Sequence, residues 1–239
     1  MDAKEANKIV DYVFRDVFGV DNFLTLEETR KVFAYDVQLP EKAKSMLGDS
    51  YVWGDFKKGD KIASYAELIE KFGKNDFMNP RKEVDSIEDL LTEWDKINYH
   101  AGERYFDSRE VVESDSIIGS SNIFRSEKIV NCENQVYCYN NGNSKYLVAS
   151  KDNAACVSGI RIDLSKYCTS CYNITWSGKI SKSMYILDCM DLYECLFCSQ
   201  LRGKKYCIAN MQFEKEEYFR IKKMVVEWTI EQIKERAKK

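Results

Sequence analysis

Histidine is almost missing from this chain of 239 residues, which has only His100. A chain with one histidine cannot form a metal site that needs two, and most histidine-based catalytic centres are excluded as well. His100 lies in the segment Asn98-Tyr99-His100-Ala101, just before a repetitive part of the sequence. We expect it at the surface or at a junction between two parts of the fold.

Long apolar runs and an excess of basic residues are also missing. No run of 18 apolar residues is present, so the sequence predicts no transmembrane helix. The 36 lysines and arginines face 39 aspartates and glutamates, and this net charge of −3 gives no sign of nucleic-acid binding. The first residues, MDAKEANKIVDY, lack the apolar core of a secretory signal. We therefore expect neither a membrane nor a nucleic acid as partner, and a reducing, cytoplasmic location.

Cysteine is absent from the chain before Cys132, and all nine cysteines share one phase. All of their positions are divisible by three: Cys132, Cys138, Cys156, Cys168, Cys171, Cys189, Cys195, Cys198 and Cys207. Every third residue from Ile117 to Cys207 is almost always small or aliphatic, with Lys204 as the clear exception. The register continues for about ninety residues without a slip, which indicates an internal repeat.

A period of three residues fits neither a single helix nor a straight strand. A helix repeats after about 3.6 residues and a strand after about two. A period of three indicates short straight pieces separated by regular corners, with one residue of each piece pointing inward. The sequence therefore predicts a β-solenoid, whose narrow core suits serine and cysteine.

A longer repeat within this region bears on the length of one coil. Four similar units contain Tyr146, Tyr167, Tyr185 and Tyr206, and the steps between successive units are seven, six and seven triplets. This spacing favours coils of six or seven triplets, or about five coils from Ser114 to Asn210. A coil of four triplets, with four inward positions, is the alternative, and in that case Asn141 and Asn153 would stack as an internal amide ladder. The tyrosines precede inward residues, so they could form an outer ladder that binds a glycan or a protein, although packing between coils is the more common role.

The segment before the repeat carries the signals of helices. An apolar stripe predicts a helix from Lys4 to Phe18. Residue pairs typical of a helix start predict three more: Thr25 with Glu28, Ser64 with Glu67, and Ser86 with Asp89. These helices are expected to extend to Tyr35, Phe72 and Ile97. We interpret residues 1–112 as a mainly helical region beside or over the first coil.

The segment after the repeat, Glu214 to Lys238, predicts one long amphipathic helix. It could cover the last coil, or it could pack on another chain and hold an oligomer together. The predicted fold class is therefore α+β: a mainly helical region (1–112), a β-solenoid (113–212) and a closing helix (213–239).

The closing segment resembles a known family. Residues 201–218 read LRGKKYCIANMQFEKEEY. They are similar to the closing motif L-[RK]-N-K-K-Y-C-I-[LF]-N-K-Q-[YF]-[ST]-K-E-E-Y of Cys-rich repeat proteins from bacteriophages and small-genome bacteria, with departures at Gly203, Ala209, Met211 and Glu214. The resemblance covers the repeat and this segment, about 45% of the chain. It supports the repeat fold and implies a role in a phage particle, but the family has no activity to carry over.

The cysteines also allow a chemical interpretation. Cys168, Cys171, Cys195 and Cys198 form two C-x-x-C pairs, a pattern that can hold zinc through four thiolates. The solenoid already imposes a spacing of three, however, so free structural thiols in the core are the preferred interpretation. Disulfides are not expected, because the number of cysteines is odd and the expected location is reducing. We predict no metal and no cofactor, with zinc as the alternative.

Paired carboxylates are the remaining candidates for catalysis. Asp188 with Asp191, and Glu110 with Glu113, could in principle form the acid pair of a glycoside hydrolase. No such constellation repeats along the chain, so we predict no catalytic residues. The preferred hypothesis is a non-enzymatic structural or binding protein that contacts other proteins or itself through its last helix, as a component of a bacteriophage virion or its assembly. A zinc-stabilised intracellular adaptor and a carbohydrate-processing β-helix enzyme are the alternatives.

Overall fold

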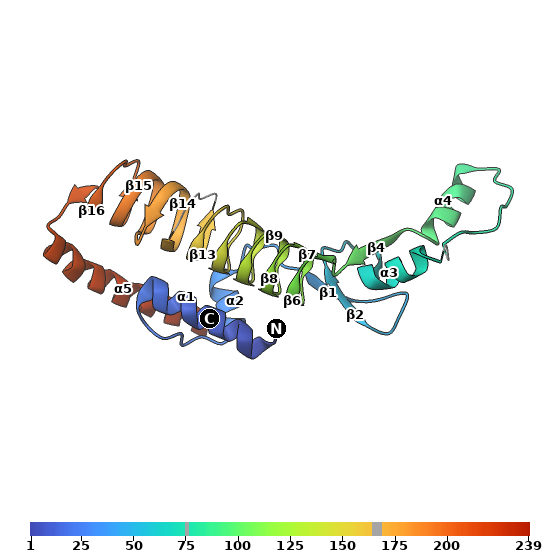
Figure 1. Cartoon of the computed structure of the whole chain (residues 1–239), viewed down its shortest axis with the longest axis horizontal. Helices are drawn as coiled ribbons and strands as arrows, with labels where there is room; N and C mark the ends of the chain where they lie inside the picture. Colours follow the sequence, from blue (N-terminus) through green and yellow to red (C-terminus); the bar gives the residue numbers. More distant parts are fainter. Residues whose placement is uncertain (75–76, 164–168) are drawn as a thin grey trace.

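The computed structural model describes residues 1–74, 77–163 and 169–239. The molecule is elongated, with a parallel β-solenoid in its middle (Figure 1). Three helices lie along one side of the solenoid, and an arm with two further helices projects from one end (Figure 1). The predicted class, a β-solenoid with helices before and after it, is confirmed.

The described strands of the solenoid form parallel pairs whose residues lie four triplets apart in the sequence. The first pair joins Tyr105 to Ile117, and the last joins Leu196 to Ile208. The strands are β5 (Tyr105–Phe106), β6 (Arg109–Val112), β7 (Asp115–Ile118), β8 (Ser121–Phe124), β9 (Glu127–Val130), β10 (Glu133–Val136), β11 (Tyr139–Gly142), β12 (Lys145–Val148), β13 (Val157–Asp163), β14 (Thr169–Ser181), β15 (Met184–Ser199) and β16 (Lys205–Ile208). One turn thus consists of four triplets, and the stack has about eight turns.

The coil length predicted from the four tyrosine units, and with it the count of about five coils, is wrong. Steps of six and seven triplets are not whole turns, because one turn consists of four. Tyr146 and Tyr206 therefore share a face, whereas Tyr185 lies on a different one, so these three tyrosines do not form a ladder. Tyr167 lies outside the described residues. The units look alike because these tyrosines come directly before inward positions of the triplet pattern. Any whole number of triplets between two such tyrosines keeps this relation, so their spacing does not reveal the length of a turn.

The corners of the coil explain the three-residue period. Each corner residue has a positive φ, for example Asn122 (57°), Asn134 (58°) and Asn140 (52°), and the next residue points inward. Asparagine and aspartate adopt this left-handed conformation more readily than most residues. The inward positions are buried as predicted: Cys132 is 1% exposed and Cys138 is 0% exposed.

Serine and cysteine suit these inward positions because each can donate one hydrogen bond and accept another. The Ser126 hydroxyl donates to the Phe124 carbonyl and accepts from the backbone N–H of Cys138, one turn later, at 2.9 Å. The Cys138 thiol donates in turn to the Val136 carbonyl. Asn141 and Asn153 form the amide ladder expected for a coil of four triplets, since Asn153 Nδ2 lies 3.2 Å from Asn141 Oδ1. Hydrogen bonds of this kind join the inward side chains of successive turns, although Asn153 Oδ1 has no partner among the described residues.

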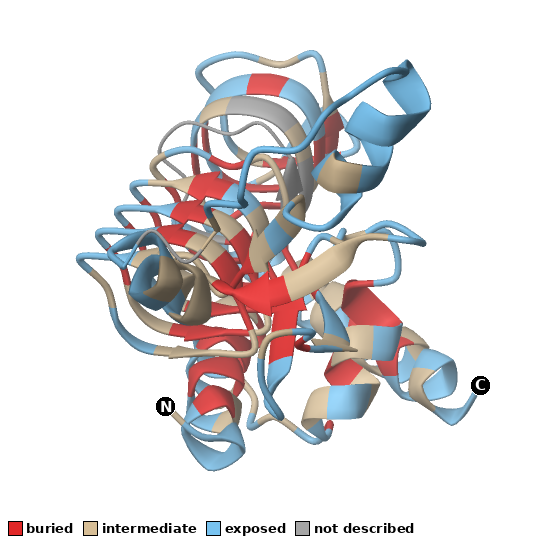
Figure 2. Ribbon diagram, turned by 90° about the vertical axis from the view of Figure 1, so that its right-hand side faces the viewer, coloured by how far each residue is buried: buried red, intermediate tan, exposed pale blue. Residues whose placement is uncertain are grey.

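One outward column of the solenoid is apolar along its whole length. Its members lie one turn apart: Val112, Phe124, Val136, Val148, Ile160, Tyr172, Met184, Leu196 and Ile208. The column is covered by α1 (Ala3–Phe18), α2 (Leu26–Phe33) and α5 (Lys215–Lys238), which turn their buried faces toward it (Figure 2). This second apolar core, outside the coil, fixes the helices to the solenoid.

The helix starts agree with the sequence signals. Thr25 and Ser64 form the expected capping boxes of α2 and α3 (Tyr65–Phe72), and Ser86 caps α4 (Ile87–Asp95). The helix α5 does not lie across the open end of the last coil. It runs back along the flank and buries Tyr218, Thr229 and Ile233, while β17 (Met211–Gln212) pairs antiparallel with β16 at the end of the stack.

Four short strands occur in the region that was expected to be mainly helical. The strands β1 (Glu41–Lys44) and β2 (Tyr51–Gly54) pair antiparallel, and β3 (Lys61–Ser64) pairs in parallel with β4 (Tyr99–Gly102). The solenoid itself begins at β5, before residue 113. These strands are too short to show a period, and the partner of β3 is distant in the sequence, so local sequence patterns did not reveal them.

Candidate functional site

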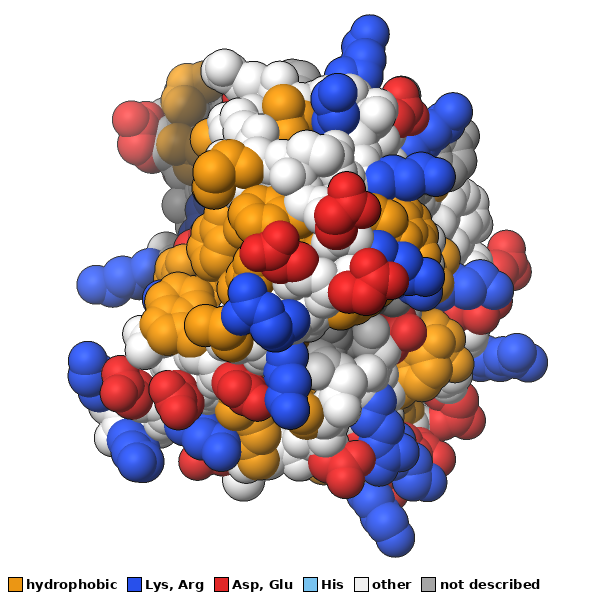
Figure 3. All heavy atoms as spheres, turned by 90° about the vertical axis from the view of Figure 1, so that its left-hand side faces the viewer, with side chains coloured by type: hydrophobic (Ala, Val, Ile, Leu, Met, Phe, Trp, Pro, Cys, Tyr) orange, Lys and Arg blue, Asp and Glu red, His pale blue; other side chains and the backbone are white. Residues whose placement is uncertain are grey.

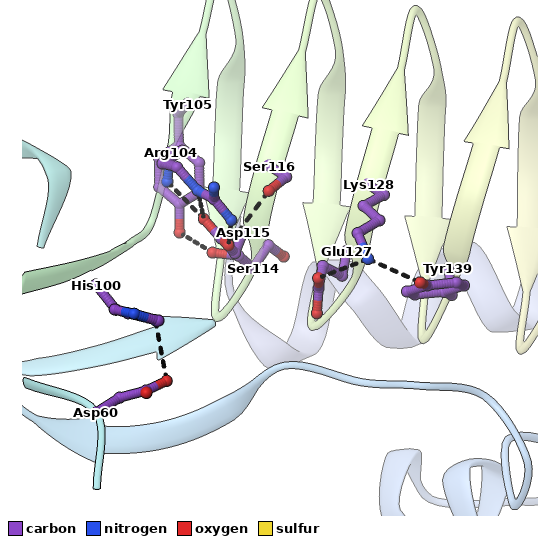
Figure 4. Close-up of polar contacts among 10 residues, drawn as sticks. All are labelled: Asp60, His100, Arg104, Tyr105, Ser114, Asp115, Ser116, Glu127, Lys128 and Tyr139. Carbon is purple, nitrogen blue, oxygen red and sulfur yellow. Dashed lines mark hydrogen bonds and ion pairs between the residues drawn. The ribbon is translucent and has the colours of Figure 1, made fainter. Parts of the chain in front are cut away.

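Two buried carboxyl groups lie where the first turns of the solenoid meet the N-terminal strands. Asp115 and Glu127 occupy the same outward column, one turn apart, and each has an exposed fraction of 0% (Figure 4). The sequence pattern does not reveal them, because charged residues in outward positions are normally solvated. β2 of the N-terminal region packs against β7, the strand that carries Asp115, and Asp55, directly after β2, is close enough to act on the pKa of Glu127.

The charge of Asp115 is compensated. Arg104 Nε lies 3.1 Å from Asp115 Oδ1, Arg104 Nη2 contacts the other oxygen, and the backbone N–H of Arg104 donates to Asp115 at 2.9 Å. The hydroxyl of Ser116 donates a further hydrogen bond at 3.2 Å. These contacts satisfy both oxygens of a buried carboxylate.

Glu127 lacks such compensation. Within the described part of the chain, neither of its carboxyl oxygens has a hydrogen-bond partner. Lys128 Nζ is 3.7 Å from Glu127 Oε1, but its hydrogen bond goes to the Tyr139 hydroxyl at 2.8 Å (Figure 4). Burial, helped by the negative charges of Asp55 and Asp115, raises the pKa of Glu127 to about 7, while Lys128 and Arg104 oppose this rise. Glu127 is therefore a group that exchanges a proton near neutral pH.

A stacked pair of carboxyl groups, one of them with a raised pKa, could in principle perform acid–base catalysis on a glycoside. Neither carboxyl has exposed surface, so a substrate cannot reach them in this conformation. The pair that was considered from the sequence, Glu110 with Glu113, is committed to other contacts: Glu110 pairs with the N-terminal amino group, and Glu113 lies 3.8 Å from Arg125. Asp188 and Asp191 lie exposed at successive corners.

The candidate zinc ligands point into the solenoid. Cys171, Cys195 and Cys198 are at most 1% exposed, and Cys168 lies outside the described residues. Cys171 and Cys195 stand two turns apart in one column, and Cys198 is on the next face. Among the residues that the structure describes, no three or more histidine, cysteine, aspartate or glutamate side chains gather in a way that could hold a metal ion.

Cys132, Cys138, Cys189, Cys195, Cys198 and Cys207 are buried, and they form no disulfide among the described residues. Burial raises the pKa of Cys132 to about 11 and that of Cys138 to about 12. Thiols with such pKa values stay protonated at neutral pH, so these two are neither nucleophiles nor thiolate ligands there. Their hydrogen bonds to backbone carbonyls are those of core residues.

His100 lies at the surface, as expected. It belongs to β4, about half of its side chain is exposed, and its Nδ1 is 3.0 Å from Asp60 Oδ2 (Figure 4). His100 is thus a surface residue of the junction, paired with Asp60.

Large exposed apolar side chains occur at both ends of the molecule, and others lie along the solenoid, as at Ile118, Val130 and Val157. We call residues 65–97, which hold α3 and α4, the arm; its large exposed apolar residues are Ile69, Phe72, Met78, Val84, Ile87, Leu90, Leu91, Trp94 and Ile97. We call the exposed apolar residues at the other end the terminal patch: Tyr193, Met211, Phe219 and Met224. No residue of α3 or α4 is buried. Surfaces of this kind mark sites of contact with other molecules.

Among the described helices, not one is both long and apolar enough to cross a membrane. Comparisons with protein-family models, curated proteins and solved structures find no significant match to this chain. Its function is therefore argued from its own residues.

Proposed function

We propose that this protein is a non-enzymatic structural or binding protein, in which the solenoid is a rigid spacer between two contact ends. The observation that supports this most directly is α4, whose apolar stripe of Ile87, Leu90, Leu91 and Trp94 is 50–66% exposed. These residues have the i, i+3, i+4, i+7 spacing of a helix that docks into a groove. The apolar column on the flank of the solenoid, by contrast, is already covered by the chain's own helices.

The construction of the solenoid supports the role of a spacer. Its turns are joined by continuous parallel pairing and by hydrogen bonds between inward side chains of successive turns. Each turn adds about 4.8 Å along the axis, so the stack of about eight turns separates its ends by roughly 40 Å. The acidic pair Asp115 and Glu127 is sealed inside the junction, which favours a structural role for it over catalysis.

The resemblance of the closing segment to phage and small-genome Cys-rich repeat proteins suggests a more specific form of this proposal. In that form the protein is a component of a bacteriophage particle or of its assembly. Contact through the terminal patch and α5 would then join it to other proteins of the particle. This specific form depends on the resemblance of residues 201–218 alone.

Photo-crosslinking in the cells or particles that contain the protein tests the proposal. A photoreactive amino acid is placed at Trp94 in the arm, at Met211 in the terminal patch, or at Val130, an exposed position in mid-solenoid that serves as the control. We expect covalent adducts with protein at Trp94 and Met211, and far fewer at Val130. The absence of protein adducts at both ends would contradict a structural or binding role.

A further inference from the structure

We infer that copies of this protein join head to tail, with the arm of one copy docked on the terminal patch of the next. This inference rests on the proposed function, because it names a second copy of the chain as the partner of both ends. Its basis is that the two exposed apolar surfaces carry opposite charge and lie at opposite ends of the long axis (Figure 1).

The arm is strongly acidic around its apolar stripe. Residues 83–95 include six carboxylates and no basic residue. Lys82 and Lys96 pair with Glu93, and Lys61 pairs with Asp95, so part of this charge is balanced. The segment 81–96 as a whole, with three basic and six acidic residues, still has a net charge of −3. Trp94, which is 60% exposed, offers a large side chain of the type that anchors protein interfaces.

The chain segment that holds most of the terminal patch has a net positive charge. Residues 202–224 include seven lysines and arginines and three glutamates, for a net charge of +4. Lys222 pairs with Glu194 and Arg220 pairs with Glu217, so part of this charge is balanced. Figure 3, which faces this end, shows hydrophobic side chains with both basic and acidic side chains among them. Met211 and Met224 are 56% and 57% exposed, and methionine adapts its shape to an incoming side chain. The patch thus offers two features that an acidic amphipathic helix requires: apolar contact area and a net positive charge on the segment that carries it.

Charge also decides which surfaces pair. Two acidic arms repel each other, as do two basic patches, whereas an arm and a patch attract. Because the arm and the patch lie at opposite ends, a contact between two copies leaves one arm and one patch open. Such a heterologous contact propagates into an open chain instead of closing as a dimer.

Two variants and their mixture test this arrangement. Leu91→Glu places a charge in the apolar stripe of the arm, and Met224→Glu places one in the terminal patch. Both side chains are more than half exposed, so both variants should fold, and unchanged thermal midpoints verify this. Lys8→Glu, an exposed position on α1, is the control for a change toward negative charge outside the arm and the patch, and it changes the net charge by two units instead of one. The association of each protein is measured by sedimentation velocity over a range of concentrations.

The wild-type chain and Lys8→Glu should form a concentration-dependent series that exceeds twice the chain mass of 27.9 kDa. Each of the two disabling variants should remain monomeric alone. Their equimolar mixture should form a heterodimer of about twice the chain mass and nothing larger, because it contains one functional arm and one functional patch per pair. Raising the salt concentration from about 50 to about 500 mM should weaken the association, since salt screens exposed charges.

Three results would overturn the inference: a monomeric wild-type chain, self-association that persists in either variant alone, or a mixture that stays monomeric. The proposed function fails by a different measurement, the absence of protein adducts at both ends. If the purified chain is monomeric but Trp94 and Met211 crosslink to other proteins, the head-to-tail inference is wrong and the binding role remains.

Discussion

The buried carboxyl of Glu127 links the stability of the fold to pH. Its pKa is about 7 in the folded chain, against an ordinary value of 4.5. Between these two values the folded state holds a proton that the unfolded state has released. The contribution of Glu127 to stability is therefore complete below about pH 4.5 and is lost as the pH rises to about 7.

We predict that Glu127→Gln removes this dependence. In the wild-type chain, the loss amounts to about 3 kcal/mol of unfolding free energy between pH 4.5 and 7. Glutamine has no proton to lose, so the variant should be more stable than the wild type at pH 8 and should show a flatter profile. Urea denaturation at several pH values measures both effects. The exposed Glu231→Gln is the control, and a wild-type profile that coincides with that of Glu127→Gln would refute the assignment.

A second prediction concerns the inward phase at Cys189. Cys189 is 1% exposed, and its thiol donates to the Leu187 carbonyl and accepts from the Leu201 N–H. Cys189→Asp would bury an unpaired carboxylate, and we expect a loss of about 3–5 kcal/mol in unfolding free energy. Cys189→Ser should be far milder, because serine fills the same role at position 183, where it is fully buried.

The exposed neighbour Asp188 is the control for that series. Asp188→Asn changes a residue one position out of phase and should leave the unfolding free energy within about 0.5 kcal/mol of the wild type. Equal losses for Cys189→Asp and Asp188→Asn would show that the triplet phase does not mark the interior.

Residue by residue, the sequence predicted the inside of the coil better than the outside. The phase of three identifies the inward positions because a narrow core admits only small or aliphatic side chains. The buried pair was missed because β2, which packs against the strand of Asp115, lies far earlier in the chain. A contact of that kind leaves no local pattern.

At the scale of the elements, the helices on the flank bury some positions of the solenoid and leave others exposed, although these positions have the same place in the triplet pattern. Leu187 and Leu196 each follow an inward residue, yet Leu196 is 0% exposed beneath the helices and Leu187 is 49% exposed. The triplet phase is the same for both, and only the length of the turn places them on different faces.

We therefore predict unequal effects from the same substitution. Leu196→Ala should lower the unfolding free energy by about 2–4 kcal/mol, because it leaves a cavity between the solenoid and the helices. Leu187→Ala should cost less than about 1 kcal/mol. Chemical denaturation of the two variants measures both losses in unfolding free energy. Similar losses would mean that the helices do not cover the column that contains Leu196.

Helix starts were predictable because capping is a local interaction between residues three positions apart, as at Thr25 and Ser64. The path of α5 was not predictable. Its apolar face is compatible with the end of a coil, with a second chain or with the flank, and only the apolar column from Val112 to Ile208 decides for the flank. The residues of that column can be recognised in the sequence only when the number of residues in one turn is known.

In the whole molecule, the length of one turn determines which residues align on a face of the solenoid. It therefore also determines where the helices pack and how far apart the arm and the terminal patch lie. The triplet register alone is compatible with turns of four, six or seven triplets. The misleading signal was the tyrosine before an inward residue, which recurs for reasons of local geometry. The length of one turn follows instead from the backbone pairing of each turn with the next, which the sequence pattern does not show.

The turn of four triplets is tested most directly by one distance between spin labels. Ser121 and Ser181 lie in the same column, five turns apart, on partly exposed positions. Labels attached there through noncanonical amino acids leave the cysteines untouched. With turns of four triplets, the two backbones should be about 24 Å apart. A separation of about 14 Å, which corresponds to three longer turns of six or seven triplets, would contradict the account.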